Sequence, residues 1–107
     1  MQTTDIAITN EQRHILEVIL REFLSEPTIV WAFGSRTNGR TRLYSDLDLA
    51  LERVDGKGIP LARLVDLQEA FKETDLPYKV DVLDYCQLKD GVFKKNIDVQ
   101  KKKFITV

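Results

Sequence analysis

The feature that most constrains the fold of this chain is a glycine turn between two strand-like segments, the second of which begins with two closely spaced acidic residues. Residues 28–33 form a β-branched and aromatic run that predicts a strand, and its continuous apolarity predicts burial on both faces. Gly34 follows directly. Residues 46–54 begin Asp-Leu-Asp-Leu and predict a second strand. Because strand side chains alternate between faces, Asp46 and Asp48 must share one face.

A third acidic residue stands in a similar segment. In residues 78–83, Asp81 lies between Val80 and Val82, which predicts a strand with the aspartate on one face and the valines on the other. Carboxylates held close together repel one another unless a cation lies between them. Carboxylate oxygens suit Mg²⁺ or Mn²⁺. If the two strands are neighbours, the sequence predicts a metal site that comprises Asp46, Asp48 and Asp81.

The turn between the two strands has residues suited to a phosphate. Gly34 lets the backbone approach a ligand closely, and Ser35 offers a hydroxyl and a backbone N–H. Arg36 is the best candidate for a charged contact because a guanidinium matches phosphate oxygens in a two-pronged geometry, and Arg40 and Arg42 add charge nearby. The predicted nucleotide-binding set is Gly34, Ser35, Arg36 and Ser45.

Apolar residues at helical spacing predict three helices, from residue 10 to about 25, from 60 to about 74, and from 89 to about 100. Thr9 and Gln12 have the form of a capping box at the start of the first helix. The residues expected to point inward from the second and third helices are Leu61, Leu64, Val65, Leu67, Phe71, Val92, Phe93 and Ile97. A last strand is expected at residues 104–107. Asp84 is a weaker alternative metal ligand, since it falls at a strand end on the opposite face from Asp81.

Strands that alternate with helices predict an α/β fold, a mixed β-sheet with helices packed on one face, and the opposite face is left for the chemistry. The chain has 107 residues, so a single domain over residues 1–107 is expected. A formal charge of −1 gives no basic surface for direct nucleic-acid binding. No apolar stretch is long enough to cross a membrane, and one cysteine, Cys86, permits no internal disulfide, so a cytoplasmic location is expected.

The combination of Gly34-Ser35, ten further residues, Asp46-Leu47-Asp48 and the later Asp81 resembles the nucleotidyltransferase family of the polymerase-beta superfamily, in its minimal single-domain form. The resemblance implies transfer of a nucleoside monophosphate, expected to be AMP from ATP, to a hydroxyl with two metal ions. Asp46 and Asp48 would bind metal, and Asp81 would complete the acceptor-side metal and take the proton of the attacking hydroxyl. Family members often have an arginine where this chain has Asn38.

Small proteins of this build also look like the antitoxin of a toxin–antitoxin pair whose toxin is an all-helical HEPN-type ribonuclease. The resemblance then implies that AMP is placed on a tyrosine of that partner and silences it. Two other interpretations stay open from the residues. The chain could be a non-catalytic binding module that neutralises its partner by occupying a surface, or it could nucleotidylate a small molecule, which would require a substrate domain that this sequence does not contain.

Overall fold

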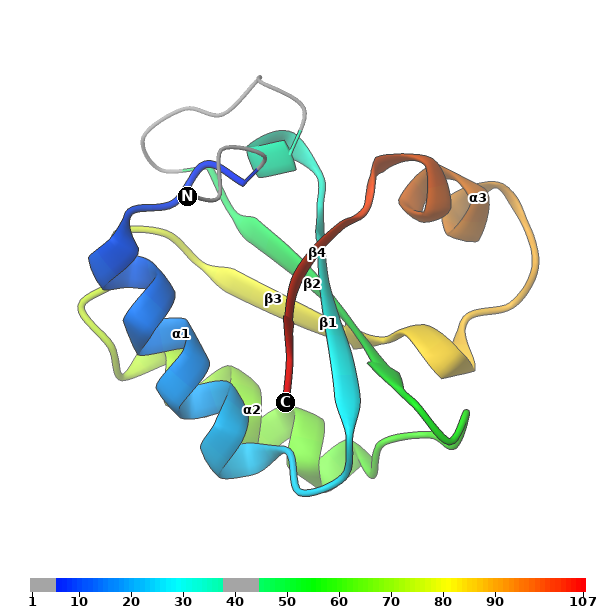
Figure 1. Ribbon diagram of the computed structural model, residues 1–107, viewed down its shortest axis with the longest axis horizontal. Coiled ribbons are helices and arrows are strands. Elements are labelled where there is room, and N and C mark those ends of the chain that lie inside the picture. The colour runs from blue at the N-terminus through cyan, green and yellow to red at the C-terminus, as the bar shows by residue number, and fades with distance from the viewer. Residues whose placement is uncertain (1–5, 38–44) are drawn as a thin grey trace.

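The computed structural model describes residues 6–37 and 45–107 of the chain. Figure 1 shows the order of the elements within these residues. They are α1 (Asn10–Phe23), β1 (Thr28–Phe33), the short 3₁₀ turn η1 (Ser35–Thr37), β2 (Leu47–Arg53), α2 (Leu61–Lys72), β3 (Val80–Asp84), a second 3₁₀ turn η2 (Tyr85–Gln87), α3 (Val92–Gln100) and β4 (Lys102–Thr106). Each predicted helix and strand is therefore present, with ends that move by a few residues.

The strands form one four-stranded sheet in the order β3-β2-β1-β4. β1 is antiparallel to both of its neighbours, whereas β2 and β3 are parallel. A parallel pair needs a crossover of a dozen or so residues, which α2 and its flanking loops provide. The predicted mixed α/β sheet is confirmed, and the parallel pair brings the two aspartate-bearing strands side by side.

The main hydrophobic core lies between one face of the sheet and the helices α1 and α2. These helices lie next to each other across that face in Figure 1. Leu47, Leu49 and Leu51 of β2 are fully buried in this core, as the alternation in the sequence predicts. The predicted capping box at the start of α1 is also confirmed, because the Thr9 side chain accepts the Gln12 N–H and the Gln12 side chain accepts the Thr9 N–H. Burial of this face fixes which residues of β2 and β3 project from the other face.

The third helix differs from the other two, since its C-terminal end lies over the opposite face of the sheet. Lys101, which caps α3, places its ammonium 4.4 Å from the ring centre of Trp31. Trp31 lies between the core residues Val30 and Ala32 and therefore projects from the other face. Burial along β1 alternates between buried and partly buried residues, so the second face of this strand is covered less completely than predicted. Figure 1 shows α3 well apart from α1 and α2.

Part of the predicted apolar stripe on α2 and α3 is also wrong. Leu61 is 75% exposed and Val65 is 51% exposed, while Leu67 and Phe71 are buried. At about 100° of rotation per residue, Leu61 and Val65 fall about 80–160° around the helix from Leu67 and Phe71. On α3, Val92 and Phe93 are exposed and Ile97 alone is buried among the three predicted residues. Within the described ranges, no helix combines the length and the apolarity that a bilayer crossing requires.

Candidate functional site

The turn after β1 requires glycine for two separate reasons. Gly34 has a φ of +87°, in the left-handed region that side chains disfavour. A Cβ atom at this position would also stand 2.6 Å from Oδ2 of Asp48, which is closer than real Cβ contacts. The predicted turn and the predicted metal ligand are therefore in direct contact, and the missing side chain makes that contact possible. The turn then continues into η1, which begins at Ser35.

The two strand aspartates are neighbours. Asp48 of β2 and Asp81 of β3 are directly opposite each other in the parallel register, and both alternate with core residues, so they project from the face opposite α1 and α2. Asp46 comes one residue before β2 and is exposed. Partial burial of Asp48, followed by the nearby charges of Asp81 and Asp46, raises the pKa of its carboxyl group. Each cause is one that a bound cation would relieve.

The three carboxylates gather less closely than expected. Across residues 6–37 and 45–107, no three acidic, histidine or cysteine side chains form a group close enough to hold a metal ion. One Asp81 oxygen instead lies 3.3 Å from the Lys79 ammonium, and mutual repulsion keeps like charges apart. The donor set nevertheless fits a hard divalent cation, because it consists of carboxylate oxygens with one member, Asp48, whose ionised form is disfavoured. The sequence pattern did not identify Lys79 as part of the site, although its position two residues before Asp81 places both side chains on the same face of an extended chain.

The arginine of the turn, Arg36, is buried, whereas a residue that contacts a phosphate is expected to be exposed. Arg36 is 6% exposed, and its Nε and Nη1 donate to the backbone carbonyls of Ser45 and Ala7 at 2.9 and 2.8 Å. The main chain at Ser45 is thereby tied to the turn. Predicted Arg40 and Arg42, and the departure at Asn38, lie outside the described residues.

Two further polar residues, Gln100 and Asp84, hold the backbone in or near the site. Gln100, at the end of α3, accepts the Gly34 N–H through Oε1 at 3.2 Å, and nothing in the local sequence pattern pointed to it. Asp84, the weaker alternative ligand, is buried and accepts the backbone N–H groups of Ile59 at 2.6 Å and Cys86 at 3.1 Å. Asp84 therefore holds the loop ahead of α2, and both of its carboxylate oxygens accept backbone N–H groups.

A glycine turn against a strand carboxylate, with a second carboxylate beside it, is the arrangement that the resemblance predicts. The family pattern described as polymerase beta nucleotidyltransferase matches residues 14–106 of this chain. The chain belongs to this nucleotidyltransferase family. The match covers each element from within α1 to the end of β4.

Individual relatives of this nucleotidyltransferase have been described in more detail. The chain is 42% identical over 79 residues to a probable protein adenylyltransferase, MntA, of Haemophilus influenzae, covering 74% of this chain and 67% of that protein. Its fold is similar to a chain in a solved toxin–antitoxin structure with AMP-PNP, with a TM-score of 0.70, 22% identity and coverage of 91% and 73% of the two chains. It is also similar to a chain in the complex of a tri-AMPylated Shewanella oneidensis HEPN toxin with an MNT antitoxin, with a TM-score of 0.61, 16% identity and coverage of 92% and 72%.

Proposed function

We propose that this nucleotidyltransferase transfers AMP from ATP to a hydroxyl group of a HEPN-type toxin and thereby silences that toxin as its antitoxin. The observation that carries the proposal is the side-by-side placement of Asp48 and Asp81 on the face opposite the core, with Asp48 against the Gly34 turn. Family membership supports nucleotidyl transfer, and the relative described as a probable protein adenylyltransferase supports AMP and a protein acceptor. The solved complexes of similar fold support the HEPN-type partner.

The roles of the site residues follow from their positions. Asp46 and Asp48 would hold Mg²⁺ or Mn²⁺, and Asp81 would share the acceptor side. When bound, such ions neutralise the phosphate charges and lower the pKa of the attacking hydroxyl. Gly34 and Ser35 would receive the phosphate tail, since the glycine leaves the backbone open to close approach. Ser45, directly before Asp46, completes the proposed nucleotide-binding residues.

In the transfer step, one bond to phosphorus forms, one breaks, and a residue of the site takes up the released proton. The acceptor oxygen forms a bond to the α-phosphorus of ATP, the bond from that phosphorus to the bridging oxygen breaks, and pyrophosphate leaves. Asp81 accepts the proton of the acceptor hydroxyl. Its side chain is 41% exposed and can reach a group presented by another protein, whereas the partly buried Asp48 lies against the Gly34 turn. We further propose that residues 1–107 form one domain and that it works in the cytoplasm.

The test uses ATP labelled at the α-phosphate, Mg²⁺, the purified chain and the HEPN-type product of the neighbouring gene. Label is expected on the partner, and Asp46→Asn combined with Asp48→Asn is expected to abolish it. Asp66→Asn, the same chemical change on the exposed side of α2, serves as the matched control and should transfer normally. If the double variant neutralises the partner as well as the unaltered chain does, the protein acts as a binding module and the proposed reaction is wrong.

A further inference from the structure

Arg36 fastens together two stretches of chain that are far apart in the sequence. Its Nη1 donates to the Ala7 carbonyl at 2.8 Å, and its own carbonyl accepts the Ala7 N–H, also at 2.8 Å. Its Nε donates to the Ser45 carbonyl at 2.9 Å. One side chain therefore joins the segment that leads into α1 to the residue that immediately precedes Asp46.

The guanidinium of Arg36 is also fixed from a third direction. It stacks on the Tyr78 ring with 3.9 Å between the guanidinium carbon and the ring centre, and Tyr78 is itself only 7% exposed. The Tyr78 hydroxyl donates at 3.0 Å to Oε1 of Gln12, which belongs to the capping box of α1. Burial raises the pKa of Tyr78 to about 12, so the hydroxyl keeps its proton and remains a donor. The position of Arg36 is therefore determined by contacts on several sides.

Asp46 stands at the entrance of β2, one residue before the strand begins. The strand begins at Leu47, whose N–H donates to the Lys79 carbonyl at 2.9 Å, and Asp46 stands just outside this ladder. The Asp46 carboxylate is near enough to Arg36 to favour the charged guanidinium, although burial has the larger effect and lowers the pKa of Arg36. The hydrogen bond from Arg36 to the carbonyl of the preceding residue is therefore a contact that orients the chain at Asp46 relative to Asp48.

We propose that Arg36 is a positioning residue that sets where Asp46 stands for metal binding, and that it is not a contact of the nucleotide phosphates. The proposal rests on the proposed function for the identity of the metal ligands. The reason is geometric. The guanidinium donates to two backbone carbonyls and stacks on a buried ring, so its planar group is already used in contacts within the protein. A lysine at this position keeps the charge but cannot reproduce this planar arrangement of donors.

The test measures binding of Mn²⁺, followed by the electron paramagnetic resonance signal of the free ion, with AMP-PNP present. Arg36→Lys is expected to weaken Mn²⁺ binding about tenfold, the scale of one lost charged hydrogen bond. AMP-PNP binding measured separately in EDTA should change less than about twofold, because the phosphates lose no partner. With ATP and the HEPN-type partner, kcat should fall while the KM for ATP stays nearly constant.

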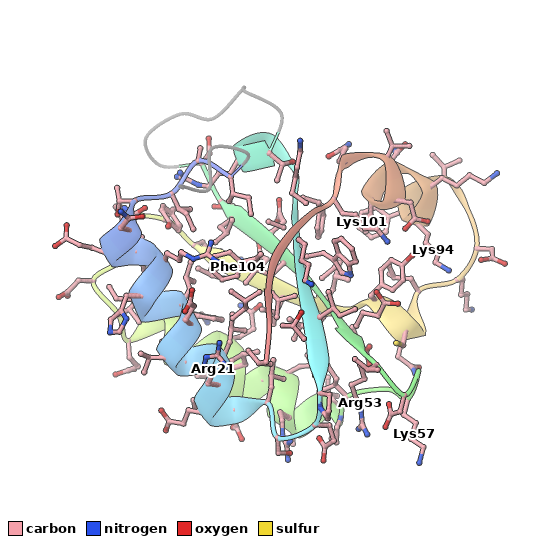
Figure 2. All side chains as sticks on the ribbon, in the orientation of Figure 1. Arg21, Arg53, Lys57, Lys94, Lys101 and Phe104 are labelled. Carbon is pink, nitrogen blue, oxygen red and sulfur yellow. The ribbon has the colours of Figure 1, made fainter. Side chains whose placement is uncertain are left out.

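Arg13→Lys is the matched control, because its guanidinium makes the same kinds of contact far from the aspartates. Nη2 of Arg13 donates to the Phe104 carbonyl at 2.9 Å, and the guanidinium stacks on the Phe104 ring at 4.6 Å. Figure 2 shows Phe104 on β4, at the other edge of the sheet from β3. Any loss of thermal stability should be similar for the two variants, while only Arg36→Lys should weaken Mn²⁺ binding.

The proposal is overturned if Arg36→Lys binds Mn²⁺ as tightly as the unaltered chain, or if it weakens AMP-PNP binding in EDTA about tenfold, which would identify a phosphate contact. Should Arg36→Lys fail to fold, Tyr78→Leu provides the second variant, because it removes the stacking ring and leaves both carbonyls in place. It should weaken Mn²⁺ binding in the same direction, and unchanged binding overturns the proposal. If Arg36→Lys weakens Mn²⁺ binding as expected but the unaltered chain transfers no AMP, the proposed function fails and this inference stands.

Discussion

Replacing Asp48 with Asn should make the folded chain more stable in the absence of divalent cations, although it removes a proposed metal ligand. Asp48 stands directly opposite Asp81 across the parallel pair, and partial burial adds to the cost of its charge. Like charges directly opposite on neighbouring strands destabilise a sheet by ~0.2–1 kcal/mol. For a domain of this size, 1 kcal/mol corresponds to ~4–8 °C in Tm. We therefore expect Asp48→Asn to raise Tm by about 1–8 °C at neutral pH.

The pH dependence has a definite sign. The pKa of Asp48 is raised in the folded chain, so its ionised form opposes folding above that pKa. Below the unfolded-chain value of about 3.9, the carboxyl is protonated in both states and the penalty disappears. The Tm advantage of Asp48→Asn should therefore be largest near neutral pH and should shrink as the pH falls toward 4.

The assay is thermal unfolding followed by circular dichroism, with EDTA and then with saturating Mg²⁺ and AMP-PNP. Added metal and nucleotide should stabilise the unaltered chain, because a ligand that binds only the folded state raises its stability, and should stabilise Asp48→Asn much less. Asp66→Asn, on the exposed side of α2, should match the unaltered chain in both conditions. A lower Tm for Asp48→Asn in EDTA, or equal stabilisation of both chains by Mg²⁺, would refute the reasoning.

Three further outcomes can be checked by the same unfolding assay and by AMP transfer. Gly34→Ala should lower Tm and abolish transfer, because it adds a clash with Asp48 to the cost of a positive φ. Gly56→Ala, with a φ of +77° and no atom within 4 Å of the added Cβ, should show only the smaller backbone cost. Equal losses of Tm in the two variants would exclude the clash. Asp84→Ala should destabilise the fold by ~2 kcal/mol, since two backbone N–H groups lose a charged acceptor, and should leave Mn²⁺ affinity intact. Gln100→Leu should slow transfer without a comparable loss of Tm, because the Gly34 N–H loses its acceptor; an unchanged rate would show that α3 does not support the turn.

The sheet and the placement of its aspartates could be predicted because they depend on short-range alternation. Leu47 and Leu49 are buried, so the pleat alone places Asp48 on the other face, and the same holds for Asp81 between Val80 and Val82. What the pattern does not contain is the pairing of strands. That Asp48 and Asp81 are direct neighbours depends on the parallel crossover through α2, which the sequence left open.

The roles of Arg36 and Gln100 could not be predicted, because they depend on partners that are distant in the sequence. Arg36 bonds Ala7, which is 29 residues away, and Gln100 bonds Gly34, which is 66 residues away. A polar side chain beside a glycine turn has the same local pattern whether it faces solvent or the interior. Contacts of Lys101 and Lys94 were equally unpredictable from the local sequence. Figure 2 shows both side chains below α3, and their ammonium groups lie 4.6 and 5.3 Å, respectively, from the centre of the Tyr85 ring.

Two unfavourable electrostatic features of the described residues lie together at the site, which favours an enzyme over a passive binding module. Asp48 and Asp81 form a like-charged pair, and the pKa of Asp48 is raised. Both features lie beside the left-handed Gly34, where β1 ends and β2 begins. By contrast, the buried Asp84 has two backbone donors, as a structural carboxylate should. A surface that only occupies a partner gains nothing from carboxylates that repel each other, whereas a site that takes up divalent cations recovers their cost when the cations bind. The proposed metal-dependent reaction would account for the raised pKa of Asp48.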